Sequence, residues 1–157
     1  MRTIILDANV LILFLAGNAD RKLLGTAVGL KEFEFADLEL VNEFAFSTVR
    51  HVSLPNVLTE TSNMLRQIKG FQKSGALIRK YCETLDEVHE PSKNVAEHVH
   101  FDLLGLTDAA ILMASLVQRT AGHEVVVLTR DKDLHGKLVS QKIEAINPDH
   151  YKTPKRK

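Results

Sequence analysis

The chain is poor in the residues that mark disulfide-rich or disordered proteins. It has one cysteine, Cys82, no tryptophan and four prolines in 157 residues. A single cysteine cannot form an internal disulfide, which excludes a disulfide-stapled scaffold and fits a reducing compartment. Hydrophobic residues make up 45% of the chain, which excludes disorder as its main state. We therefore expect a cytoplasmic globular protein in which Cys82 is a small core residue.

The chain also lacks an excess of charge and a long apolar run. Lys plus Arg and Asp plus Glu number 20 each, so no global field attracts a polyanion. Any binding of nucleic acid must then come from a local basic surface or from a bound metal. The apolar run at 10–16 is far too short to span a bilayer, and Asp7 and Asn9 precede it. We interpret this run as part of the fold and expect no membrane attachment.

The spacing of apolar segments predicts a single α/β domain. Short β-branched runs alternate with longer helical segments, which is the pattern of a parallel sheet covered by helices. Strands are expected at residues 3–6, 49–53, 125–128 and 143–146, and helices at 10–15, 21–30, 55–68, 74–85, 93–101, 108–119 and 132–140. Residues 31–46 fit neither period and stay unassigned. The domain is expected to cover residues 1–148, followed by a basic tail at 149–157.

Four acidic residues stand beside apolar segments that are expected to be buried. Asp7 and Asp131 each follow a predicted strand. Asp108 opens an apolar helix for which Thr107 is a good N-cap, and Glu60 lies at the border of the apolar stripe of the helix at 55–68. Because the carboxyl ends of parallel strands share one edge of the sheet, we expect these acids to meet there.

Carboxylates that meet in one place need a positive charge. Two of them about 4 Å apart repel by roughly 1 kcal/mol in water and by roughly 4 kcal/mol at an effective dielectric constant near 20. No Lys or Arg is spaced to pair with Asp108. Oxygen donors without thiolates favour Mg²⁺ or Mn²⁺ over zinc, so the sequence predicts a site for one or two such ions.

Each acid also has an ordinary structural interpretation. Asp7 and Asp131 are good helix caps, and Asp108 suits the first turn of a helix because of the helix dipole. Glu60 alone is more often a solvated glutamate at the edge of a stripe. Asp133 either binds a second ion or faces solvent.

Three further polar groups have two interpretations. Asn9 and Thr129 are turn residues by default, and in a metal site they would orient ligands or water. The pair His98-x-His100, with His89 nearby, suggests zinc, but the sequence supplies no cysteine or further ligand beside it. We therefore give the zinc interpretation little weight.

Around the four acids the chain resembles the PIN-domain family of nucleases. Four motifs carry the resemblance, in order from Met1 to about Pro148: Leu6-Asp7-Ala8-Asn9-Val10-Leu11, Leu58-Thr59-Glu60, Leu106-Thr107-Asp108-Ala109-Ala110 and Leu128-Thr129-Arg130-Asp131-Lys132-Asp133-Leu134. The resemblance implies a three-layer α/β fold with a central, mostly parallel sheet, and metal-dependent hydrolysis of RNA phosphodiester bonds. Many small members are toxins held inactive by an antitoxin protein, and many dimerise. Here Asp7 and Glu60 are further apart than in compact toxins, and the excess falls at residues 31–46.

The resulting hypothesis is an endoribonuclease whose catalytic and metal-binding residues are Asp7, Glu60, Asp108 and Asp131, with Asp133 as a further metal ligand. No side-chain nucleophile is needed, because a divalent cation lowers the pKa of a bound water and neutralises charge on the phosphate. Phosphate contacts are expected from Arg130, Lys132 and the tail residues Lys152, Lys155, Arg156 and Lys157.

Two other functional classes remain open. A phosphotransfer or phosphatase domain also has an aspartate after its first strand, but such a phosphatase needs a second Asp at position 9, where this chain has Asn9. A catalytically inactive module of the same fold would bind a partner protein only. The presence of all four acids disfavours this second alternative.

Overall fold

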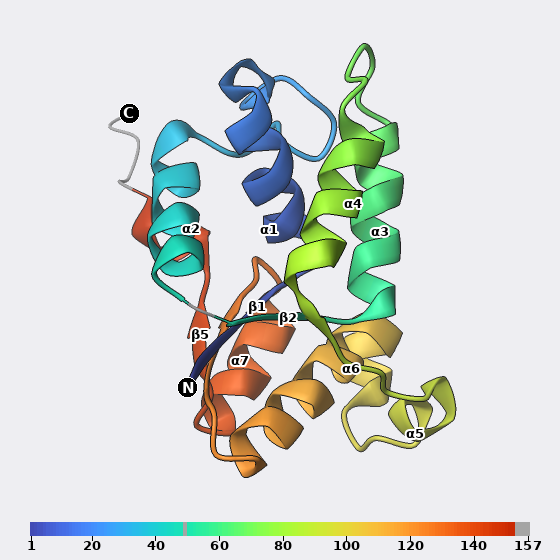
Figure 1. Cartoon of the computed structure of the whole chain (residues 1–157). Helices are drawn as coiled ribbons and strands as arrows, with labels where there is room; N and C mark the ends of the chain where they lie inside the picture. The colour runs from blue at the N-terminus through green and yellow to red at the C-terminus, as the bar shows by residue number, and fades with distance from the viewer. Residues whose placement is uncertain (49, 153–157) are drawn as a thin grey trace.

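The core of the molecule is a parallel sheet with helices on both faces (Figure 1). The structure, a computed structural model, describes residues 1–48 and 50–152. In these residues the sheet has five strands in the order β3-β2-β1-β4-β5, all of them parallel. The strands are β1 (Arg2–Leu6), β2 (Arg50–Ser53), β3 (Asp86–Glu87), β4 (Glu124–Leu128) and β5 (Glu144–Ile146).

Two layers of helices enclose the sheet, which confirms the predicted three-layer α/β architecture. In Figure 1, α1 to α4 lie on one side of the sheet and α6 and α7 on the other. The helices are α1 (Ala8–Ile12), α2 (Phe35–Ser47), α3 (Pro55–Arg66), α4 (Ser74–Thr84), α5 (Ser92–Ala96), α6 (Phe101–Thr120) and α7 (Lys132–Ser140). A π-helical turn, Leu13–Gly17, continues α1, and 3-10 turns cover Arg21–Leu23 and Pro148–Tyr151.

The strand order reverses at the carboxyl end of β1. After β1 the chain adds β2 and β3 on one side, and β4 then returns to the other side of β1. Open α/β sheets bind ligands at such a reversal, outside the carboxyl ends of the strands. The ladder ends there with two backbone bonds, from the Asp7 N–H to the Leu128 carbonyl and from the Thr129 N–H to the Ile146 carbonyl, each 3.0 Å long.

The predicted helix at residues 21–30 is wrong. Only Arg21–Leu23 forms a short 3-10 turn, and loops follow. Gly25 and Gly29 have φ angles of 74° and 80°, which lie in the left-handed region that a right-handed helix excludes. At Gly29 a Cβ atom would lie 3.1 Å from the Ile12 side chain and 3.2 Å from that of Met64, so the glycine also permits close packing on α1 and α3.

The unassigned segment contains α2. Its amino end has a capping box, in which the Glu34 N–H donates to Asp37 Oδ2 at 2.7 Å. The apolar period is obscured because Phe35 and Phe46 are 42% and 71% exposed, although Leu38 is fully buried. Sequence periodicity therefore had no clear stripe to detect. The expected strand at 49–53 is β2, and Val49 lies outside the described residues.

Four smaller differences concern the second half of the fold. The two-residue strand β3 was not predicted, and the helix expected at 93–101 covers only Ser92–Ala96. The next helix, α6, begins at Phe101 and contains a break at Gly105. Cys82 is exposed, contrary to expectation, because α4 faces the core through the neighbouring Tyr81, which is 6% exposed.

The helix α6 is long and apolar enough to cross a membrane, judged by length and composition alone. In this structure it is a core helix of the domain. Its residues Ala109, Ala110, Ile111 and Leu112 are at most 1% exposed. This burial accounts for the apolar character of the middle of α6, whereas Leu103, Leu106 and Val117 are exposed.

Candidate metal centre

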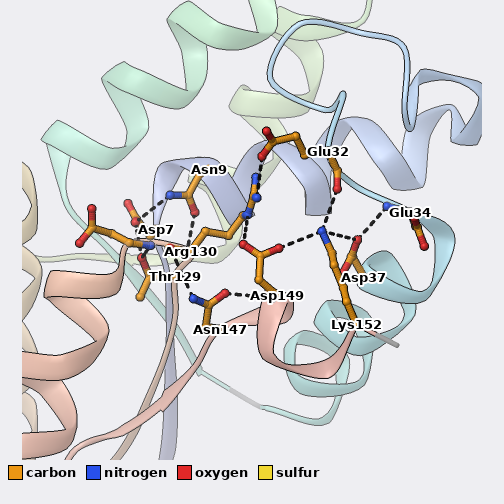
Figure 2. Close-up of polar contacts among 11 residues, drawn as sticks. Asp7, Asn9, Glu32, Glu34, Asp37, Thr129, Arg130, Asn147, Asp149 and Lys152 are labelled. Carbon is orange, nitrogen blue, oxygen red and sulfur yellow. Dashed lines mark hydrogen bonds and ion pairs between the residues drawn. The ribbon is translucent and has the colours of Figure 1, made fainter. Parts of the chain in front are cut away.

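Asp7 lies directly beyond β1 and is held in one orientation by three donors (Figure 2). Its Oδ1 accepts from the Ala8 N–H at 2.7 Å. Its Oδ2 accepts from Thr129 Oγ1 at 2.6 Å and from Asn9 Nδ2 at 3.2 Å. The residue is 4% exposed, and this burial raises the pKa of Asp7 against the opposing effect of the Thr129 and Ala8 bonds. The negative charges of Glu60 and Asp131 raise that pKa further.

Asn9 and Thr129 connect Asp7 with the loop after β4. The Arg130 N–H donates to Asn9 Oδ1 at 3.3 Å, and the Asp131 N–H donates to Thr129 Oγ1 at 3.0 Å. Thr129 is fully buried. The same two side chains therefore fix Asp7 and the backbone that carries Asp131.

Asp131 serves as the N-cap of α7, which is the ordinary role that its sequence context also allowed. Its Oδ1 accepts from the Leu134 N–H at 2.8 Å. The cap and a role in the site are compatible, because a carboxylate has about four lone-pair positions. Asp133 is exposed in the first turn of the same helix.

The break at Gly105 places Asp108 near the start of the longer part of α6. Gly105 has φ 74° and ψ −177°, a conformation reserved almost entirely for glycine. Asp108 is partly buried, and burial is the largest cause that raises its pKa to about 7. The charges of Asp7, Asp131, Glu60 and Asp133 contribute to the same shift. Carboxyl groups from the end of β1, from α3 and from the start of α7 therefore repel Asp108 at this end of the sheet.

Glu60 is exposed on α3 and contacts α6 directly. Its Oε1 accepts from Thr107 Oγ1 at 2.5 Å. Thr107 was expected to cap the helix of Asp108, but its hydroxyl instead connects two motifs that are 47 positions apart. In the sequence Thr107 stands beside Asp108, and nothing there indicates that its hydroxyl bonds to Glu60.

The donor set suits a hard divalent cation, although the carboxylates do not form a closed ligand shell. Among the described residues, no group of three or more His, Cys, Asp or Glu side chains is positioned to hold a metal ion. Yet the pKa of Asp108 is raised by burial and by the charges of four neighbouring carboxylates. Mg²⁺ keeps several waters and is commonly bound through one or two carboxylates, so such a loose arrangement fits it.

The guanidinium of Arg130 is engaged in ion pairs on the far side of Asn9. Its Nε lies 2.9 Å from Asp149 Oδ2, and its terminal nitrogen lies 2.7 Å from Glu32 Oε2 (Figure 2). The group also stacks 4.8 Å from the centre of the Phe33 ring. The predicted phosphate contact of Arg130 would therefore compete with these internal partners.

Lys152 is anchored to the domain, although the sequence placed it in a loose tail. Its Nζ lies 2.8 Å from Asp149 Oδ1, 3.6 Å from the buried Asp37 and 2.8 Å from the Glu32 carbonyl oxygen. Of the other predicted phosphate contacts, Lys132 is exposed at the start of α7. The tail residues Lys155, Arg156 and Lys157 lie outside the described residues.

Sequence reasoning missed Asn147 and Asp149, which support the loop of Arg130. Asn147 is 2% exposed and its amide donates to the Arg130 carbonyl at 3.4 Å, while its Oδ1 accepts from the Asp149 N–H. Asn147 could have been predicted from its position directly after the last strand, because that strand ends at the same edge of the sheet as the strand before Asp7. The zinc interpretation gains no third ligand in the described part of the chain: the rings of His98 and His100 lie 5.5 Å apart.

A search of family models and a search of curated proteins found no match for this chain. The resemblance to PIN-domain nucleases accordingly stays a prediction, carried by the four motifs.

Proposed function

We propose that this protein is a PIN-type endoribonuclease that hydrolyses RNA phosphodiester bonds with bound Mg²⁺ or Mn²⁺. The observation that carries the proposal is the environment of Asp108, whose pKa is raised to about 7 first by burial and then by repulsion from the charges of Asp7, Asp131, Glu60 and Asp133. Such repulsion is costly to the fold unless a cation neutralises it. Perturbed carboxyl groups in a crevice are typical of functional sites.

Asp7 and Asp108 are the residues best placed to hold the ion, with Asp131 and Glu60 beside them. Bound Mg²⁺ or Mn²⁺ would supply an activated water and neutralise charge on the phosphate. Thr129 and Asn9 fix the direction in which Asp7 presents its oxygens, through bonds of 2.6 and 3.2 Å. Thr107 does the same for Glu60. Asp133 is exposed, as Glu60 is, and would approach a second ion.

The remaining expectations are part of the same proposal. We propose a cytoplasmic location, an antitoxin or other inhibitory partner and a homodimer, all on the basis of the resemblance. The phosphatase alternative is disfavoured because Asn9, which occupies the position of the second aspartate, donates its amide to Asp7. A partner-binding module without catalysis predicts that no divalent ion binds and that RNA stays intact.

Cleavage of RNA by single carboxamide variants tests the proposal. Asp7→Asn and Asp108→Asn should each lower Mn²⁺-dependent cleavage by about a hundredfold or more, because each removes a negative ligand while keeping its size. Asp102→Asn is the matched control, since Asp102 is exposed on the same helix as Asp108 and does not contribute to its pKa shift. Cleavage should be followed on a labelled single-stranded RNA, with far-UV circular dichroism to verify folding. Undiminished cleavage in either site variant would remove that residue from the mechanism.

A further inference from the structure

Two segments of this neutral chain carry positive charge and no negative charge. Residues 21–31 and 61–82 carry eight of its 20 Lys and Arg and contain no Asp or Glu. The first segment contributes Arg21, Lys22 and Lys31. The second, which spans the end of α3 and most of α4, contributes Arg66, Lys69, Lys73, Arg79 and Lys80. All eight side chains are exposed, and we refer to them as the basic surface.

The two segments lie side by side although about 40 positions separate Lys31 from Lys69 in the sequence. Lys31 and Lys69 line the same hollow, together with Thr26 and Gln67. Gly29 packs against Met64 of α3, which fixes the contact between the segments. In Figure 1 the loop after α1 and the turn between α3 and α4 occupy the same end of the molecule.

The basic surface begins beside the candidate metal centre. Lys31 and Arg130 line a second hollow, next to the one that Lys31 shares with Lys69. The next residue, Glu32, pairs with Arg130, whose backbone N–H donates to Asn9. A continuous path of neighbouring residues therefore leads from Asp7 through Asn9 and Arg130 to Lys31.

The cations of the basic surface are available to a ligand. Within residues 1–48 and 50–152, none of the eight forms an ion pair with a carboxylate. By contrast, both Arg130 and Lys152 are engaged by Glu32 and Asp149. Aromatic side chains lie among the cations: the Arg21 guanidinium is 4.6 Å from the centre of the Phe35 ring. Phe71, between Lys69 and Lys73 in sequence, lines a further hollow with Lys73.

We propose that the basic surface binds the sugar-phosphate backbone of single-stranded RNA and guides it to the carboxylates at Asp7. This inference rests on the proposed function for the identity of the ligand. The carboxylates repel a polyanion and the whole chain has no net charge, so attraction of RNA requires a local cationic surface. Exposed cations interspersed with aromatic rings are the combination that binds single strands without reading their sequence.

RNA binding measured without metal ions tests this inference separately from the proposed hydrolysis, because no cleavage is expected in EDTA. The probe is a fluorescently labelled single-stranded RNA of about 20 nucleotides in EDTA, with anisotropy measured between about 50 and 200 mM salt. The variant is Lys31→Gln with Lys69→Gln. Its matched control is Lys93→Gln with Lys142→Gln, two exposed lysines outside the basic surface.

The Lys31/Lys69 variant should bind about tenfold more weakly than wild type near 0.1 M salt, and its salt slope should fall by about 1.4. The control pair should bind as wild type does. Equal weakening in both pairs, unchanged binding in the Lys31/Lys69 variant, or no binding by wild type would each overturn the inference. If RNA binds through Lys31 and Lys69 but stays intact in Mn²⁺, the basic surface is supported as an RNA-binding site and the proposed hydrolysis is contradicted. If the protein cleaves RNA but its binding does not depend on these lysines, the hydrolysis is supported and the inference about the basic surface is contradicted.

Discussion

Among single residues, Asp108 carries the clearest conflict between burial and charge. Burial and four neighbouring carboxylates raise its pKa from 3.8 to about 7, so folding disfavours the ionised form. A cation would reverse this preference, because an opposite charge nearby favours the carboxylate. Proton and metal ion should therefore compete for the site.

This conflict predicts how stability depends on pH in EDTA. Between pH 3.8 and about 7 the folded protein holds a proton that the unfolded chain has released, so stability falls as pH rises through this window. Asp108→Asn removes the ionised form and should stabilise the metal-free protein by about 1 kcal/mol at pH 8, after allowance for partial solvent exposure. Urea unfolding at pH 5 and pH 8 measures the effect, with Asp102→Asn as control. Equal gains at the two pH values would contradict the raised pKa.

The positions of Asn9 and Thr129 just beyond two strand ends follow from the apolar pattern. Asn9 lies two positions from Asp7, whereas Thr129 lies 122 positions away and meets Asp7 because β1 and β4 pair in the sheet. The bond from Thr107 to Glu60 did not follow, because it depends on how α3 packs beside α6. The ion pairs of Arg130 were likewise not predicted, since Glu32 lies in the unassigned segment 31–46 and Asp149 in the expected tail.

Among the elements, α6 depends on one backbone conformation to position Asp108. Gly105→Ala would place a Cβ on a residue with φ 74° and ψ −177°, a strain of about 1–3 kcal/mol. We expect lower thermal stability and weaker Mn²⁺-dependent cleavage, because relief of the strain would redirect the turn that carries Thr107 and Asp108. Thermal unfolding followed by circular dichroism measures the first effect.

Gly136→Ala is the matched control for Gly105. Gly136 lies within the helix α7 with open space around the added methyl group. Alanine there should be neutral or stabilise by about 0.4–1 kcal/mol. An equal response at the two glycines would show that the break at Gly105 carries no strain of its own.

Elements with a clear period were predicted well. The segments now seen as β1, β4, α3, α4 and α7 each had a continuous apolar run or a distinct stripe. The helix expected at 21–30 failed because two glycines there adopt left-handed conformations. Residues of α2 were left unassigned because Phe35 and Phe46 face outward, which removes the contrast between the faces of the helix.

For the whole molecule, the strand order decides where the acids lie. The sequence predicted a parallel sheet, and parallel strands must end at one edge, so the approach of Asp7 and Asp131 was predictable. The order β3-β2-β1-β4-β5 was not, because it depends on which strands pair across long crossovers. The basic surface was hidden for a similar reason: its two segments are separated in sequence, and the net charge of the chain is zero.

Metal-dependent stability tests the central claim most directly. Thermal melting of the wild-type chain in EDTA and in Mn²⁺ should show a stabilisation of about 2.7 kcal/mol when Mn²⁺ reaches a hundred times its dissociation constant. Asp7→Asn should lose most of this gain, because it removes the buried carboxylate at the carboxyl end of β1. An unchanged melting temperature of the wild-type protein with Mn²⁺, or an equal gain in Asp7→Asn, would contradict a cation held by these acids.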